Sequence, residues 1–283
     1  MKATSQRVAG SADLRAKERA ENFPVALRLL PRKYRADLRA IYDVVRVIDD
    51  LGDLADGDRV ALLHDYQGDL ARAWTDERPD HATCRRLRAT IERRGLTRQP
   101  FDDLISANLM DQTVSTYPTF DDVLHYCSLS AAPIGRLVLQ VFGQSSPGQQ
   151  EMSDRICIAL QLLEHWQDVA EDHQAGRTYL PQDDLARFDV PPGDLKASTT
   201  SSALRSLIRF ETTRANDLLE SGAPLVATLH GWARLAVAGY LSGGRATVDA
   251  LRRSDGDVMP APPKPSRPDT LRHLTRELWR SCR

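Results

Sequence analysis

The sequence has few features of a secreted or membrane-spanning protein. Its four cysteines show no CxxC spacing, so free thiols in a reducing cytosol are the simplest interpretation. No stretch approaches the roughly 18 consecutive apolar residues that a membrane-spanning helix requires. Residues 1–23 also lack the apolar run of a signal peptide. We therefore expect a cytoplasmic protein that does not span a membrane.

An excess of charge of either sign is also missing. The 38 lysines and arginines nearly cancel the 39 aspartates and glutamates, which leaves a formal net charge of -1. A general nucleic-acid binder would usually be strongly basic, so we expect no nucleic-acid partner. No Gly-rich dinucleotide loop is present, and we expect no NAD(P)H cofactor. The sequence does not determine the oligomeric state.

The alternation of apolar and polar residues that is typical of β-strands is scarce. Apolar residues instead recur at three- and four-residue steps along nearly the whole chain, which predicts helices. The predicted helices span residues 12–20, 35–50, 58–74, 81–94, 101–113, 120–128, 131–143, 150–174, 182–187, 198–220 and 223–252. Because 41% of the residues are hydrophobic, a sizeable core can form. We expect one all-α domain over residues 1–254.

Residues 255–283 differ in composition from the rest of the chain. "DGDVMPAPPKPSRPD" is a Pro-rich linker, and the "TLRHLTRELWRSCR" that follows predicts a short basic amphipathic helix. The apolar residues that can share one face of this helix are Leu271, Leu274, Leu278 and Trp279, and its arginines are Arg272, Arg276, Arg280 and Arg283. Peripheral contact with the inner face of an anionic membrane and docking on the protein's own core are both open.

A concentration of acids marks the stretch "QLLEHWQDVAEDHQAGRTYLP", residues 161–181. Asp168 and Asp172 lie one helical turn apart, and Glu164 lies one turn before them. Like charges at this spacing weaken an isolated helix by a few tenths of a kcal/mol. A bound cation would offset that repulsion, although a solvated charged face would tolerate it. We interpret His165 as a packing or supporting residue because nothing resembles a His-rich zinc site.

A second acidic stripe lies in "IYDVVRVIDDLGD". At 100° per residue, the apolar residues of this predicted helix cluster on one side. Tyr42, Arg46, Asp49 and Asp53 form a separate stripe with steps of four, three and four. Taken alone, this is an ordinary amphipathic helix with a charged solvent face. If it faced the other acidic helix, four carboxylates would converge and would favour hard divalent cations such as Mg²⁺.

Arginines accompany both acidic stretches. Arg46 lies one turn before Asp49, and Arg177 follows Asp172 beyond Gly176. The planar donor fork of arginine suits phosphate oxygens, although both arginines could simply neutralise neighbouring carboxylates. Acid pairs with flanking arginines together indicate a diphosphate bridged by Mg²⁺.

With these motifs, the sequence resembles the squalene/phytoene synthase family of isoprenoid enzymes. "YDVVRVIDDLGD" is similar to the family's first aspartate-rich motif, and "QLLEHWQDVAEDHQAGRTYLP" is similar to its second. The resemblance covers residues 21–244. "ENFPVALRLLP", "YCSLSAAPIGRLVL" and "WQDVAEDHQAGRTYLPQDDL" are most similar to the bacterial hydroxysqualene synthase branch of hopanoid biosynthesis. The resemblance implies an isoprenoid-synthase helical bundle with a central cavity.

The resemblance also implies roles for individual residues. The acids that match the family's Mg²⁺-binding positions are Asp49, Asp53, Asp168 and Asp172. The residues that match its diphosphate pocket are Arg46, Gln161, Arg177 and Tyr179. Tyr42 matches an aromatic residue of the cavity wall and is counted with the four aspartates as catalytic. Ala131, Ala132 and Gly135 match a small-residue stretch along which a prenyl chain passes, and tight helix packing explains them equally well.

Two positions depart from the family pattern. Glu164 stands where relatives usually carry an asparagine that contacts the metal, and a glutamate there could still bind it. Arg19 stands where many relatives carry a histidine that contacts the diphosphate. Both departures bear on how substrate is held and leave the expected fold unchanged.

The resemblance implies an enzyme that ionises presqualene diphosphate with several Mg²⁺ ions and captures the cation with water to give hydroxysqualene. Asn108 and Asp111 in "LISANLMDQ" are candidates for the polar groups that would hold this water, and Asp111 could equally be an exposed or capping acid. One alternative is a head-to-head synthase that condenses two farnesyl or geranylgeranyl diphosphates. Another is a catalytically silent relative that acts in assembly.

Overall fold

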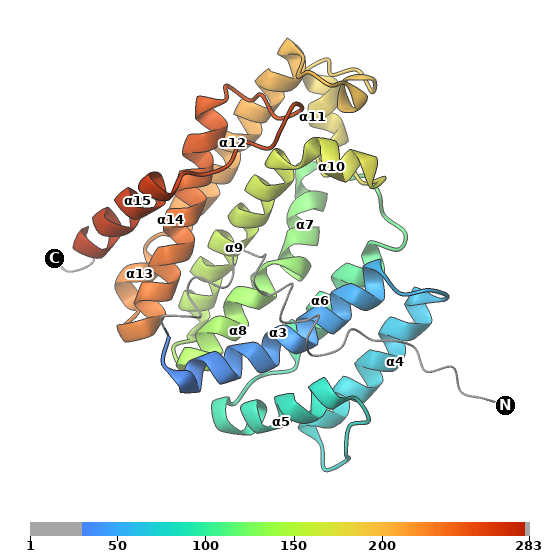
Figure 1. Ribbon diagram of the computed structural model, residues 1–283, viewed down its shortest axis with the longest axis vertical. Helices are drawn as coiled ribbons and strands as arrows, with labels where there is room; N and C mark the ends of the chain where they lie inside the picture. Colours follow the sequence, from blue (N-terminus) through green and yellow to red (C-terminus); the bar gives the residue numbers. More distant parts are fainter. Residues whose placement is uncertain (1–29, 281–283) are drawn as a thin grey trace. The chain divides into compact units, whose positions relative to one another are not determined.

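The computed structural model describes residues 30–280. These residues are helical apart from turns and connections, and they contain no β-strand, only an isolated bridge between Thr116 and Thr178. The prediction of an all-α protein is therefore confirmed (Figure 1). The predicted helix over residues 12–20 lies outside the described residues.

Several helices begin or end at proline, glycine or capping residues of the sequence. The α-helices are α3 (Arg32–Asp53), α4 (Arg59–Ala71), α5 (Ala82–Arg94), α6 (Gln99–Met110), α7 (Phe120–Ser130), α8 (Ala132–Phe142), α9 (Pro147–Gln167), α10 (Val169–Gln174), α11 (Gln182–Arg187), α12 (Ser202–Gly222), α13 (Leu225–Thr228), α14 (Gly231–Arg253) and α15 (Arg267–Arg280). Two short 3₁₀ helices, η1 (Arg72–Trp74) and η2 (Asp194–Lys196), complete the set.

Two of the predicted helices are interrupted, and their predicted continuity is wrong. The helix expected over residues 150–174 ends at Gln167, and α10 begins at Val169, because Asp168 leaves helical geometry with φ -102° and ψ 20°. The helix expected over 223–252 divides into α13 and α14. Leu229 is extended there with ψ 157°, and Gly231 has φ 57°, in the region that favours glycine.

The described residues divide between two compact units. The first contains residues up to Thr113 together with Leu137–Gly143. In it, α3 packs against α4, α5 and α6. Val44 and Ile48 from α3 meet a core that includes Leu63, Leu87 and Phe101, all fully buried. The apolar face predicted for α3 is therefore its buried face.

A charged residue lies within the core of the first unit. Asp37 on α3 is fully buried, and its two carboxylate oxygens accept hydrogen bonds from Arg93 at 2.5 Å and Arg94 at 2.7 Å. A buried carboxylate needs such partners because its desolvation is costly. These ion pairs fix the end of α5 against α3.

The second unit contains Val114–Arg136 and the residues from Gln144 onward. Its centre is α9, which packs against α7, α12 and α14, while α15 runs along α14 (Figure 1). The Pro-rich segment between α14 and α15 lies on this unit, since Val258 and Met259 are buried. Their backbone N–H groups donate to Thr200 Oγ1 at 3.1 and 3.0 Å.

Candidate active site

The first acidic stripe lies on α3, in the first unit. Tyr42, Arg46 and Asp49 are half-buried and Asp53 is exposed. Arg46 Nη2 lies 2.9 Å from Asp50 Oδ1. Because the apolar face of α3 is fixed against the core, the separate polar stripe predicted from the sequence remains accessible. Arg46 thus contacts an acid of its own helix, which agrees with the interpretation that this arginine neutralises a neighbouring carboxylate.

The second acidic motif lies in the second unit, where α9 gives way to α10. Asp168 is the residue at the break, and its backbone carbonyl accepts the N–H of Asp172 at 2.8 Å. Burial, and after it the negative charges of Glu164, Glu171 and Asp172, raise the pKa of the Asp168 carboxyl to about 6. The charged form of this acid is thus disfavoured in the protein alone. A cation placed among these carboxylates would relieve that cost.

A tight turn places Arg177 and Tyr179 after this motif. Gly176 has φ 86°, a conformation that glycine adopts without strain. The N–H of Arg177 donates to the carbonyl of Asp172 at 2.9 Å, and the N–H of Thr178 donates to that of Ser115 at 2.8 Å. The segment after the acidic motif is therefore held against the segment that precedes α7.

An aromatic cluster surrounds Tyr179. Its ring stacks on His165 with centroids 3.6 Å apart, and it lies 5.4 Å from the ring of Tyr126 and 5.6 Å from that of Tyr117. All four side chains are buried. Tyr117 and Tyr126 were not among the sequence candidates. The sequence carried a signal for each: Tyr126 begins the stretch "YCSLSAAPIGRLVL", and Tyr117 stands in the helix break before α7.

In this unit, His165 contacts both a residue predicted to bind substrate, Gln161, and a residue predicted to bind metal, Asp172. Its Nε2 lies 3.2 Å from the side-chain nitrogen of Gln161, and its Nδ1 lies 3.6 Å from Asp172 Oδ2. The structure thus brings Gln161, Asp172 and Tyr179 around one buried imidazole. This placement agrees with the interpretation of His165 as a packing and supporting residue.

The small-residue stretch begins α8. Ala132 is fully buried, and Gly135 lies against α9. A methyl group at Gly135 would overlap Ser153 Oγ and lie 2.6 Å from Cys157 Sγ. The structure therefore directly supports close helix packing, which is one of the two interpretations given to Gly135.

The acids available for a metal ion are divided between the units. Asp49 and Asp53 belong to the first unit, whereas Glu164, Asp168 and Asp172 belong to the second. Among residues 30–280, no group of three or more His, Cys, Asp or Glu side chains is arranged to hold a metal ion. The donors of both motifs are carboxylate oxygens, which are the ligands that Mg²⁺ prefers, so their chemistry fits this ion. Arg19 lies outside the described residues.

Asn108 and Asp111 lie on α6 or at its end. The Asn108 amide donates to the carbonyl of Leu104 at 3.1 Å, and its side chain fills the space beside Gly52 of α3. Asp111 is the residue that ends α6. Asn108 therefore has a packing role between α3 and α6.

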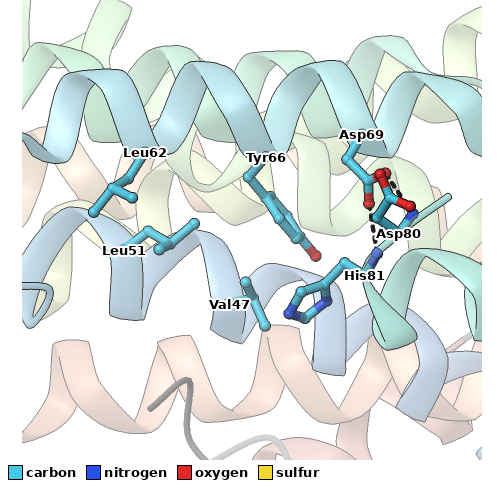
Figure 2. Close-up of a pocket in the computed structure, with 7 residues that line it drawn as sticks. All are labelled: Val47, Leu51, Leu62, Tyr66, Asp69, Asp80 and His81. Atoms are coloured by element: carbon cyan, nitrogen blue, oxygen red, sulfur yellow. Dashed lines mark hydrogen bonds between the residues drawn. The ribbon is translucent and has the colours of Figure 1, made fainter. Parts of the chain in front are cut away.

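A pocket of about 310 Å³ lies in the first unit between α3 and α4 (Figure 2). Its apolar wall includes Val47 and Leu51, which are roughly half a turn of α3 away from the Asp49 and Asp53 stripe. At its polar end, the carboxylate of Asp69 accepts the N–H groups of Asp80 and His81 at 2.6 and 2.8 Å. Asp69 thus anchors the loop before α5, and the pocket is separate from the acidic stripe.

Comparison with known proteins places these features in a family. The family model described as squalene/phytoene synthase matches residues 16–276. A hydroxysqualene synthase of Rhodopseudomonas palustris is 35% identical over 216 residues, which are 75% of this chain and 72% of the relative. A phytoene synthase of Arthrospira platensis is 30% identical over 254 residues, 84% of this chain and 82% of the relative.

A solved structure supports the same assignment. The crystal structure of squalene synthase HpnC from Alicyclobacillus acidocaldarius is 36% identical in sequence and superposes with a TM-score of 0.80, over 86% of this chain and 92% of that one. The expected isoprenoid-synthase type of helical fold is thereby confirmed. The chain belongs to the squalene/phytoene synthase family and is an enzyme of isoprenoid biosynthesis.

Proposed function

We propose that this enzyme ionises presqualene diphosphate and captures the resulting cation with water, which yields hydroxysqualene and diphosphate. The observation that supports this most directly is the second acidic motif. Gln161, Asp172 and Tyr179 contact His165, and Asp168 accepts the N–H of Asp172, in a chain that is 35% identical to a hydroxysqualene synthase. We place the enzyme in the cytoplasm, with peripheral contact at the inner face of the membrane through α15.

Arginine and amide side chains bind the diphosphate in this proposal. Arg46 and Arg177 donate hydrogen bonds to phosphate oxygens, for which the guanidinium fork is suited. Gln161 and the hydroxyl of Tyr179 add donors from the cluster around His165, and Arg19 adds another cation. These groups stabilise negative charge as it develops on the leaving diphosphate.

Carboxylates of both motifs hold Mg²⁺ in this proposal. The ligands are Asp49, Asp53, Asp168 and Asp172, with Glu164 as a further carboxylate. Bound Mg²⁺ would supply positive charge that stabilises the departing diphosphate. The raised pKa of Asp168 is the observation in this chain that favours such a role, because it results from burial and then from the negative charges of Glu164, Glu171 and Asp172.

The carbon–oxygen bond breaks with its electron pair on the diphosphate. The remaining cyclopropylcarbinyl cation rearranges along an apolar path, for which Tyr42, Ala132 and Gly135 are the candidates. The oxygen of a water molecule then bonds to the cation, and a proton leaves to solvent. This reaction needs no hydride donor.

One alternative reaction, a head-to-head condensation, is supported by a specific comparison. The chain is also 30% identical to a phytoene synthase, with coverage of 84%. A head-to-head condensation of two farnesyl or geranylgeranyl diphosphates would use the same acids and arginines. A catalytically silent relative, the remaining alternative, would turn over neither kind of substrate.

The products separate these functions. We expect purified protein with Mg²⁺ and presqualene diphosphate in H₂¹⁸O to form hydroxysqualene that carries the heavy oxygen, and NADPH to change neither the rate nor the product. Formation of squalene on addition of NADPH, or efficient condensation of farnesyl or geranylgeranyl diphosphate alone, would favour the head-to-head synthase. No product from any of these substrates would favour the silent relative.

A further inference from the structure

Ion pairs hold one side of α15 against α14. The buried Glu277 pairs with Arg245 at 2.5 Å, and Asp269 pairs with Arg253 at 2.8 Å. Between these two contacts, Asp249 Oδ2 lies 2.8 Å from both Arg272 and His273. The contacts recur along the whole helix, so α15 lies antiparallel to α14 with a fixed rotation about its own axis. Docking on the protein's own body, one of the two alternatives for the tail, is therefore observed.

The opposite side of α15 exposes large apolar side chains. Leu271 is 61% exposed and Trp279 is 60% exposed. They stand eight residues apart, close to two helical turns, and therefore share a face. From the sequence, Leu274 and Leu278 could share this face with Leu271 and Trp279. Leu274 and Leu278 are half-buried, so they are less accessible than Leu271 and Trp279.

The exposed charges of α15 have one sign. The exposed charged residues of α15 are Arg267, Arg272, Arg276 and Arg280. Its acids are less accessible: Asp269 is half-buried and Glu277 is buried, and both pair with arginines of α14. The two large apolar side chains thus accompany accessible arginines, of which Arg272 borders the docked side because it also pairs with Asp249.

We propose that the outward face of α15 binds an anionic lipid membrane. Leu271 and Trp279 insert at the level of the lipid headgroups, where the amphipathic indole ring is favoured. The arginines lie close to anionic headgroups and strengthen the attachment. The inner ion pairs keep this face turned outward without any change in the fold. No helix within residues 30–280 is long and apolar enough to cross a membrane, so the contact is with the surface.

Sedimentation of the full-length protein with sucrose-loaded vesicles tests this proposal. We expect binding to vesicles of phosphatidylglycerol and phosphatidylcholine to exceed binding to phosphatidylcholine alone at least about tenfold and to fall at high salt. The Leu271→Ser/Trp279→Ser double variant should lose at least about tenfold in binding. The Arg276→Gln/Arg280→Gln variant should bind more weakly and respond less to salt.

A matched control comes from the first unit. Leu54 is 61% exposed, as Leu271 is, so Leu54→Ser removes an equally exposed leucine elsewhere and should leave vesicle binding unchanged. The fluorescence of Trp279 gives a direct readout. Vesicles should shift the tryptophan emission of the wild-type protein to shorter wavelength, and Trp279→Phe should abolish that shift.

Several outcomes would overturn the proposal. They are failure of the wild-type protein to bind anionic vesicles, equal loss of binding in Leu54→Ser, and undiminished binding of the double variant. A change of oligomeric state in the double variant without lipid would instead identify the face as a protein interface. The membrane proposal is independent of the proposed reaction. Turnover of presqualene diphosphate in detergent should survive the double substitution, and absence of turnover in every variant would count against the reaction alone.

Discussion

Glu211 on α12 is a fully buried acid that shares one arginine with a second acid. Arg214 Nη1 donates to Asp184 Oδ2 at 2.9 Å and to Glu211 Oε1 at 3.2 Å. The guanidinium carbon of Arg214 lies 4.0 Å from the ring centroid of Phe120. Burial raises the pKa of Glu211 to about 8, and the charge of Arg214 opposes this rise. The folded protein therefore retains a proton on Glu211 at neutral pH.

This retained proton makes stability depend on pH. Between the ordinary pKa of glutamate near 4.5 and the raised value near 8, the folded state binds a proton that the unfolded state has lost. The contribution of Glu211 is therefore complete below about pH 4 and declines as pH rises toward 8, by up to about 1.4 kcal/mol per pH unit. Glu211→Gln should remove this decline.

Urea unfolding at pH 5, 6.5 and 8 measures the difference. We expect the free energy of unfolding of the wild-type protein to fall relative to that of Glu211→Gln as pH rises. Glu151→Gln, at an exposed ion pair with Arg155 on α9, serves as the control and should follow the wild-type dependence. Parallel curves for wild type and Glu211→Gln would show that Glu211 does not hold the proton.

Close packing between α9 and α12 supports the second acidic motif at the level of whole helices. Gly222, the last residue of α12, lies so near α9 that an added Cβ would stand 2.6 Å from the carbonyl oxygen of Met152 and 2.7 Å from Ile156 Cγ1. The backbone carbonyl cannot rotate away as a side chain could. Because α9 carries Gln161 and Glu164, a shift of this helix would also displace the site.

Gly222→Ala should therefore destabilise the protein by about 1–3 kcal/mol, in spite of the better helix propensity of alanine. Gly239→Ala in α14 is the matched control, since nothing lies within 4 Å of a Cβ added there. That control should be neutral or stabilising by up to about 1 kcal/mol. Urea unfolding compares the two variants. Equal effects would mean that the α9–α12 contact tolerates a methyl group.

The activity of the whole molecule depends on acids from both compact units in our proposal. Asp49→Asn and Asp168→Asn each remove one carboxylate, the first from α3 and the second from the end of α9. We expect each to lower the turnover of presqualene diphosphate at least about a hundredfold, because charge stabilisation of the leaving group is lost. Far-UV circular dichroism should not change, since neither side chain is a core contact.

Asp43→Asn provides the comparison for these two variants. Asp43 lies on α3 and pairs with Arg86 of α5 at 3.0 Å, outside the Asp49 and Asp53 stripe. Its replacement should cost at most about 1 kcal/mol of stability and leave turnover intact. Near-normal turnover of Asp49→Asn or Asp168→Asn at saturating substrate would remove that residue from the metal site.

Local periodicity in the sequence was enough to predict most of the helices, whereas the family followed from the resemblance of the two acidic motifs. Ile41, Val44 and Ile48 recur at helical spacing, so the side of α3 that is buried follows from the sequence alone, and so does the separate stripe of Asp49 and Asp53. The acidic motifs identified the family because their residues lie close together along the chain. Their predicted roles in binding substrate and metal remain predictions.

Contacts between residues far apart in the chain decided the remaining features. The pairing of Asp37 with Arg93 and Arg94 joins residues 56 and 57 positions apart, and no local pattern marks it. The outward orientation of Leu271 and Trp279 likewise follows from ion pairs between α15 and α14. An amphipathic pattern shows which residues share a helix face. The burial of that face depends on the free energy of contacts with partners that only the folded chain brings near.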